Sequence, residues 1–390
     1  MRRKAGAATV DGPTLAPYDL LAMASVTDNA QGSRTGTRAM AGEPVWTLAD
    51  IQAAGMPVEE GLMLSRRAML AAGLLGGLAA RPAQAADLPV IRLGSLPFGT
   101  STWEAAVIKA RGLDTANSFT LEATKLGGND AARISFVGGQ VDTIIGDLLW
   151  AARLGNEGQG LRFIPYSTSE GAVMVPEDSP IKSLKDLAGK KFGVAGGPLD
   201  KNWLLLKAQA KDAAGIDLER QAEIAYGAPP LITLKLEQGA LDAALTYWTY
   251  CARLEPKGFR RLIRAEDIMR ALGASGDVSL IGYLFHATTV AEKPAAVGGF
   301  YRASRSAKDM LANDPKTWDI VRPLMDAPDQ ATFESLKREF LAGIPRRPIA
   351  AERADAAKLY DILSRLGGER LVGTGAGLPP DFYYDGSRDG

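Results

Sequence analysis

The sequence predicts an α/β protein made of two similar lobes. Short apolar strands alternate with helices of apolar periodicity, which is typical of parallel sheets covered by helices. The alternation occurs twice, at an offset of one hundred residues: Trp103 matches Trp203, and the GQVD segment 139–142 matches the GALD segment 239–242. The two halves are therefore expected to form two lobes with one sheet each.

Composition excludes several classes of function. The chain has 390 residues, enough for two domains, and its 45 basic residues equal its 45 acidic ones. Zero net charge argues against nucleic acid or an anionic membrane surface as the main partner. Cys251 is the single cysteine, so no disulfide can form within the chain. With His286 as the single histidine, these two residues alone cannot form a zinc site or a nucleophilic Cys/His pair. We expect no catalytic residue, metal or cofactor, with Cys251 a buried apolar residue and His286 structural.

The N-terminal region predicts export. Residues 63–86 combine the pair Arg66-Arg67, an apolar run from Ala68 to Ala80 and the small-x-small pattern 83–85. This is a secretory signal with a twin-arginine-like start, and its apolar run is too short to span a bilayer. Residues 1–62 lack periodicity and are interpreted as a mis-assigned or disordered extension.

The elements of the first half follow in order. Strands are expected at 90–94, 120–124 and 143–145. Helices are expected at 102–110 and from Asn129, a capping residue, to about 137.

The second half repeats this order and then becomes helical. Strands are expected at 191–195, 222–226 and 243–245, with helices from Asp200 and over 230–237. Beyond 282, amphipathic helices near 293–312, 315–325, 331–341 and 349–366 are expected to pack on the first lobe. Residues 373–390, rich in Gly, Pro and Asp, are expected to be a flexible tail.

Four loops follow strands, where parallel α/β sheets bind ligands. They supply hydroxyls, carboxylates, flexible backbone and aromatic rings. The candidate ligand-binding residues are Thr100, Ser101, Thr102, Trp103, Asp147, Leu148, Trp150, Gly197, Leu199, Asp200, Trp203, Tyr247 and Trp248. Lys201 is the one basic residue in these loops, which disfavours an obligatory sulfonate or nitrate clamp.

Structural alternatives stay open for each loop. Thr100, Asp147 and Asp200 could simply cap helices. Trp150 could belong to the core. Tyr247 and Trp248 could pack between the lobes instead of forming a ligand platform.

Two segments carry a family resemblance. Residues 181–194 (IKSLKDLAGKKFGV) and 236–243 (LEQGALDA) resemble the nitrate/sulfonate/taurine-type binding proteins of ABC importers, in a likeness covering about 88–341. The resemblance implies a type II periplasmic-binding-protein fold with a two-crossing hinge. Lobe one would then comprise 87–172 and 280–372, and lobe two 173–279, with Tyr166 and Ser167 as further ligand positions at the first crossing.

The resemblance also implies a function. We expect a monomeric periplasmic protein that captures a sulfonate-like, taurine-like or related small amphiphile and delivers it to a membrane permease and ATPase. One alternative is an enzyme on the same fold, of the pyrimidine-precursor type, with Asp147 or Glu104 as acid or base. Another is a periplasmic ligand sensor.

Overall fold

The computed structural model describes residues 88–96, 99–274, 277–375 and 377–386. All of them lie in one compact unit, Pro82–Gly390. The expected extension 1–62 and the expected signal 63–86 lie outside the described residues.

The first sheet has five strands in the order β2-β1-β3-β10-β4. β1, β2 and β3 run parallel, while β10 is antiparallel to both β3 and β4. The strands are β1 (Val90–Ser95), β2 (Thr120–Lys125), β3 (Thr143–Asp147), β4 (Leu161–Ser167) and β10 (Ile281–His286).

The second sheet has five strands in the equivalent order β7-β6-β8-β5-β9. Its strands are β5 (Gly171–Pro176), β6 (Lys191–Ala195), β7 (Glu223–Gly227), β8 (Ala243–Tyr247) and β9 (Phe259–Arg264). β3 and β8 begin one hundred residues apart, at Thr143 and Ala243, and hold the same central place in their sheets. The repeat seen in the sequence is therefore a repeat of topology.

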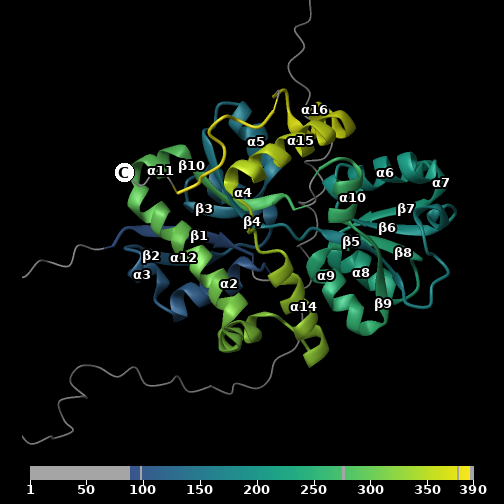
Figure 1. Ribbon diagram of the computed structural model, residues 1–390, viewed down its shortest axis with the longest axis horizontal. Helices are drawn as coiled ribbons and strands as arrows, with labels where there is room; N and C mark the ends of the chain where they lie inside the picture. Colours follow the sequence, from purple (N-terminus) through teal and green to yellow (C-terminus); the bar gives the residue numbers. More distant parts are fainter. Residues whose placement is uncertain (1–87, 97–98, 275–276, 376, 387–390) are drawn as a thin grey trace, which may run out of the picture. The chain divides into compact units, whose positions relative to one another are not determined.

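Helices cover both sheets (Figure 1). Around the first sheet lie α2 (Ser101–Ala110), α3 (Leu113–Ala116), α4 (Asn129–Val137) and α5 (Leu148–Asn156). Around the second lie α6 (Lys201–Ala214), α7 (Leu218–Gln221), α8 (Pro229–Glu237), α9 (Trp248–Leu254) and α10 (Ala265–Ala271). The C-terminal helices are α11 (Ala287–Glu292), α12 (Pro294–Asn313), α13 (Trp318–Val321), α14 (Gln330–Ala342), α15 (Ile349–Gly367) and α16 (Glu369–Val372). Short 3-10 turns are η1 (Leu184–Leu187), η2 (Glu255–Lys257), η3 (Pro315–Thr317) and η4 (Arg322–Leu324).

Two segments connect the lobes. The first runs from the end of β4 at Ser167 to the start of β5 at Gly171, and the second runs from α10 to β10. At the first crossing Gly171 has φ 156°, and a Cβ there would lie 2.1 Å from the Thr246 carbonyl oxygen. Only glycine fits this close approach to β8.

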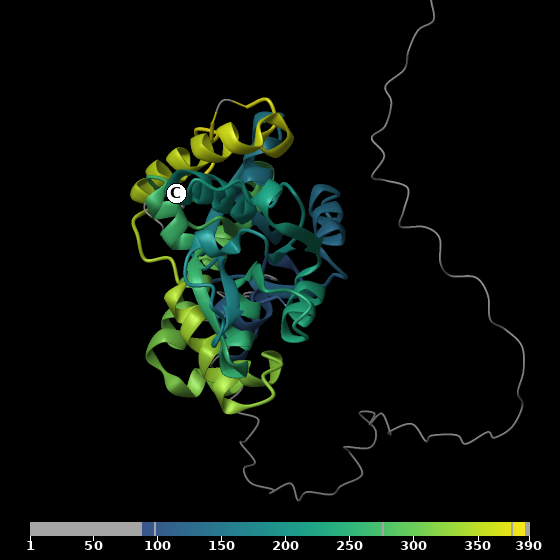
Figure 2. The ribbon, with the colours of Figure 1, turned by 90° about the vertical axis from the view of Figure 1, so that its right-hand side faces the viewer.

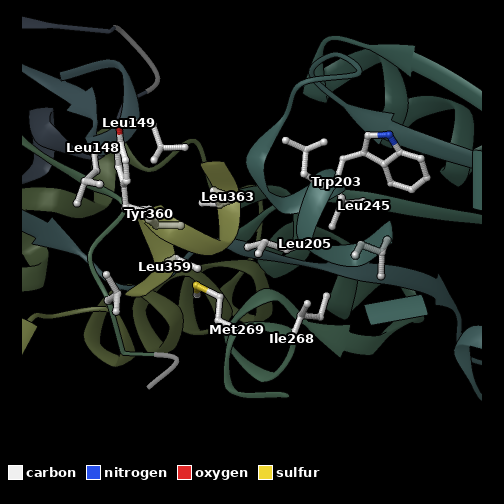
Figure 3. Close-up of a cluster of buried hydrophobic side chains, with 14 of the residues drawn as sticks. Leu148, Leu149, Trp203, Leu205, Leu245, Ile268, Met269, Leu359, Tyr360 and Leu363 are labelled. Atoms are coloured by element: carbon white, nitrogen blue, oxygen red, sulfur yellow. The ribbon is translucent and has the colours of Figure 1, made fainter. Parts of the chain in front are cut away.

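The sequence predicted that the C-terminal helices pack on the first lobe. In the structure they pack on both lobes. α12 packs on α2 in lobe one, whereas α14 packs on α9 and α15 on α6, both in lobe two, and α16 returns to α5. In Figure 2 α14, yellow-green, and α15 and α16, yellow, lie along one side of the molecule. Figure 3 shows Leu359 and Leu363 of α15 between Leu149 of lobe one and Leu205 of lobe two. Amphipathic spacing predicts that a helix buries a face, but not which partner covers it.

The prediction that residues 373–390 form a flexible tail is also partly wrong. Phe382 has no exposed surface and stacks on Phe163 at 5.3 Å between ring centroids. The Phe163 N–H donates to the Phe382 carbonyl, so the segment 377–386 adds to the edge of β4. Two buried aromatic residues, Phe382 and Tyr384, anchor a segment whose composition indicated fraying.

The predicted architecture is observed: two α/β lobes are joined by two crossings. No helix among the described residues is long and apolar enough to cross a bilayer. The crossings place the ends of β3 and β8 and the start of α6 beside one another, which is where the candidate site lies.

Candidate functional site

An ion pair joins the lobes at the predicted loops. The Lys201 ammonium at the start of α6 lies 3.0 Å from Asp147 Oδ2, at the end of β3, and 3.3 Å from Glu170 Oε2 in the first crossing. The Lys201 side chain is 14% exposed and that of Glu170 only 4%. A lysine of one lobe thus binds a carboxylate of the other lobe and one of the hinge. We call Asp147, Glu170, Asp200 and Lys201 the interlobe cluster.

Two carboxylates of the cluster also cap helices. Asp147 Oδ1 accepts from the backbone N–H groups of Leu149 and Trp150, and starts α5. Asp200 Oδ1 does the same for Asn202 and Trp203, and starts α6. The capping alternative is therefore correct for both residues. Since Asp147 uses its other oxygen for Lys201, capping and an interlobe role coexist there.

Glu170 is the most perturbed acid of the cluster. Its pKa is raised to about 7, because burial disfavours the charged form; Lys201 opposes this rise, and the nearby Asp147 and Glu266 carboxylates add to it. Its Oε2 accepts from Asn202 Nδ2 at 3.4 Å, while its Oε1 has no hydrogen-bond partner. Sequence reasoning missed Glu170, since a lone Glu in a short connection carries no motif.

Burial and neighbouring charges also shift the pKa values of Lys201 and Tyr247. Burial lowers the pKa of Lys201, but Glu170, Asp147 and Asp200 outweigh it, so that the pKa stays well above its usual range. The pKa of Tyr247 is raised to about 12, by burial first and by the Asp200 carboxylate second. Lys201 is therefore charged and Tyr247 neutral at physiological pH.

Glu170 predicts a pH dependence of stability. Because its folded pKa is raised above its unfolded value, the folded chain binds more protons between about pH 4.5 and pH 7, and stability falls as pH rises through this window. Glu170→Gln, which resembles the protonated acid, is expected to flatten this slope. Urea unfolding of the wild type and Glu170→Gln at pH 5, 6, 7 and 8 measures the pH dependence of the free energy of unfolding. The same pH dependence in the two proteins would contradict a raised Glu170 pKa.

The hydroxyls of the first loop are used within lobe one. Thr100 Oγ1 accepts from the Tyr166 hydroxyl at 2.9 Å, and Thr102 Oγ1 donates to the Gly99 carbonyl. Ser101 Oγ donates to Ser95 Oγ, and Ser167 Oγ accepts from the N–H of Ser169. These four predicted residues and Tyr166 organise the rim of lobe one and its first crossing.

The tryptophans divide between the lobe interface and the cores. Trp103 of lobe one meets Trp248 of lobe two edge to face at 6.3 Å, with 3% and 7% exposure, so that the interlobe-packing alternative describes Trp248. Trp203 is fully buried against Phe192 and is therefore a core residue of lobe two.

The remaining predicted ligand-binding residues differ in their burial. Leu148 is buried in the core at 1% exposure. Trp150 is half-buried, with the Arg133 guanidinium 4.9 Å from its ring centroid. Gly197 and Leu199, before α6, are half-buried.

The two singular residues behave as expected. His286 stacks on Phe136 at 4.3 Å, and its Nε2 lies 3.1 Å from the Phe136 carbonyl oxygen. Cys251 is fully buried, and burial raises its pKa to about 12, which keeps the thiol protonated and unreactive.

A second polar cluster lies inside lobe one. Glu104 has no exposed surface; it pairs with Lys308 and accepts from the Tyr283 hydroxyl at 2.9 Å. A cavity of about 40 Å³ lies beside Lys308, lined also by Ile164, Ser304 and Glu352. This volume suits one or two waters, far below the roughly 300 Å³ that an organic ligand occupies.

Comparisons with known proteins agree with this architecture. Residues 162–317 match the family model described as NMT1/THI5 like. No curated protein matches the sequence.

Several solved structures share the fold. The periplasmic aliphatic sulphonate binding protein SsuA from Escherichia coli is 18% identical, with TM-score 0.57, over 73% of this chain and 96% of that one. The alkanesulfonate-binding protein SsuA from Xanthomonas axonopodis pv. citri, bound to MOPS, is 17% identical, with TM-score 0.54, over 74% and 97%. A ligand-binding component of an ABC-type import system from Staphylococcus aureus, with zinc bound, is 14% identical, with TM-score 0.55, over 76% and 96%. The predicted resemblance is thus confirmed for the fold and for the matched family model.

Proposed function

We propose that this chain is the exported solute-binding component of an ABC importer, which closes two lobes over one small organic solute. The observation that carries the proposal is the Lys201 ammonium, which joins Asp147 of the other lobe to Glu170 of the hinge. Polar groups of both lobes and the hinge converge there, so a solute bound among them would couple its own binding to lobe closure. The solved structures of the same fold named above are described as binding proteins.

The enzyme alternative is less well supported by its own candidate residues. Glu104 is fully buried and held by Lys308 and Tyr283, away from any solute between the lobes. Asp147 uses one oxygen to cap α5 and the other to bind Lys201. A general acid or base must reach the proton that it transfers, and Glu104 has no route to one. We therefore favour capture without chemistry.

The proposal includes export and partners. The mature protein would act as a periplasmic monomer that delivers its solute to a membrane permease and ATPase. The mature N-terminus is expected within a few residues of Ala86, because the pattern 83–85 is a cleavage site. N-terminal sequencing of the protein from its native host checks this; recovery of residues 1–62 on the exported protein would contradict it.

The function is tested by a thermal-shift screen of the chain starting at Asp87. The panel contains sulfonates, nitrate, carboxylates, amines, guanidines and pyrimidines. A solute at one hundred times its Kd adds about 2.7 kcal/mol to stability and raises Tm accordingly. A rise with one class supports the proposal, and no rise with any class contradicts it.

A further inference from the structure

The interlobe cluster carries more negative than positive charge. Asp147, Glu170 and Asp200 face the single Lys201 ammonium. A further carboxylate, Glu266, lies 3.5 Å from the Arg264 guanidinium, which also pairs with Glu339 at 3.0 Å. An incoming anion would meet the Asp147 and Asp200 carboxylates and the Glu170 carboxyl, which is partly ionised at neutral pH, beside one cation. This arrangement disfavours an anion electrostatically.

The helix starts beside the cluster are closed to anions as well. A free helix N-terminus offers backbone N–H donors to a sulfonate or carboxylate. Here the Asp147 and Asp200 side chains already accept from two backbone N–H groups each, at the starts of α5 and α6. These two helices therefore present carboxylates toward the lobe interface in place of donors.

Two buried oxygens in the cluster lack a donor. Glu170 Oε1 and Asn202 Oδ1 have no hydrogen-bond partner, although the two residues are only 5% and 3% exposed. The two side chains are joined by a hydrogen bond from Asn202 Nδ2 to Glu170 Oε2, so both residues with a free acceptor belong to one contact. Buried acceptors without donors cost free energy. A ligand with N–H donors satisfies them, whereas a sulfonate brings only acceptors.

We propose that the solute captured by this protein carries an ammonium or guanidinium group, which binds between Asp147 and Glu170 in place of the Lys201 ammonium. The inference rests on the proposed function and names the solute class. Among the described residues no group of acidic, His and Cys side chains is arranged to hold a metal ion.

The titration of Glu170 supports this assignment. At pH 6 a proton occupies Glu170, and a bound cation must displace it. Lys201, Asp147 and Glu266 are the charged groups that act on Glu170, and Asp200 acts on its partner Lys201. Affinity for the cation is therefore expected to rise between pH 6 and pH 8.

The test sorts the thermal-shift panel by charge. Butylamine, 1,4-diaminobutane and agmatine are compared with butane-1-sulfonate and butyrate at equal concentration, within the wider panel. Stabilisation by solutes with a cationic nitrogen supports the inference. Stabilisation only by sulfonates, nitrate or carboxylates overturns the inference and leaves the proposed function standing. Stabilisation by no class overturns both.

Three variants then locate the cation. Asp147→Asn and Glu170→Gln keep size and, for residue 147, the cap, and are expected to weaken the best cationic solute roughly 10- to 100-fold. Lys201→Met removes the competing ammonium and is expected to tighten the same solute about tenfold. Asp217→Asn, which changes a capping Asp at the exposed start of α7, is the matched control and leaves affinity unchanged. Tenfold weaker binding in Lys201→Met, or unchanged binding in both Asp147→Asn and Glu170→Gln, would overturn the assignment.

Discussion

Replacing Lys308 by methionine is expected to lower the free energy of unfolding by about 3–5 kcal/mol, because the change leaves a buried charge without its partner. Glu104 is completely buried and Lys308 is 7% exposed. Lys308 also donates to Ser304 Oγ at 3.1 Å and lies 4.6 Å from the Tyr166 ring centroid. Urea unfolding followed by circular dichroism measures the loss.

Two controls distinguish the cost of leaving the Glu104 charge unpaired from the cost of losing the packing of the Lys308 side chain. The double variant Glu104→Gln with Lys308→Met removes both charges and should recover much of the stability. Lys257→Met breaks a pair with Glu237 in which Lys257 is 48% exposed, and should cost less than about 1 kcal/mol. Equal losses in Lys308→Met and Lys257→Met would show that the buried pair has no special role.

Replacing Trp248 by alanine is expected to cost about 3–5 kcal/mol, the usual range for a buried aromatic residue. Its indole is 7% exposed and packs against Trp103 of the other lobe. A ligand platform would instead lose affinity with little loss of stability. Chemical unfolding of Trp248→Ala beside Trp248→Phe distinguishes the two roles.

The phenylalanine variant retains a ring at this position and should lose clearly less stability than the alanine variant. A stable Trp248→Ala protein with weakened solute binding would contradict interlobe packing and return Trp248 to the ligand site.

The sequence predicted the fold well because its signals are local. Alternating strands and helices recur in both halves, and the structure places β3 and β8 at equivalent positions. The partners of α14 and α15 could not be predicted, because an apolar helix face does not specify what covers it. The contact of Phe382 with Phe163 could not be predicted, because Phe382 lies in a segment rich in Gly and Pro.

The candidate site was predicted in part. Asp147, Asp200 and Tyr247 lie in or beside the interlobe cluster, since strand ends and helix starts share one edge of a sheet. Trp203 and Leu148 are in the core, because a residue three positions into a helix, or one into it, can face either way. Glu170 and Asn202 become candidates only through burial and unpaired oxygens, which are three-dimensional properties.

The most direct test of the central claim is titration calorimetry of the chain starting at Asp87 with the best solute of the screen, followed by mass spectrometry of the recovered solute. We expect one solute bound per chain and recovery of that solute with its mass unchanged. Conversion of the solute into a product would show an enzyme on this fold and contradict the claim.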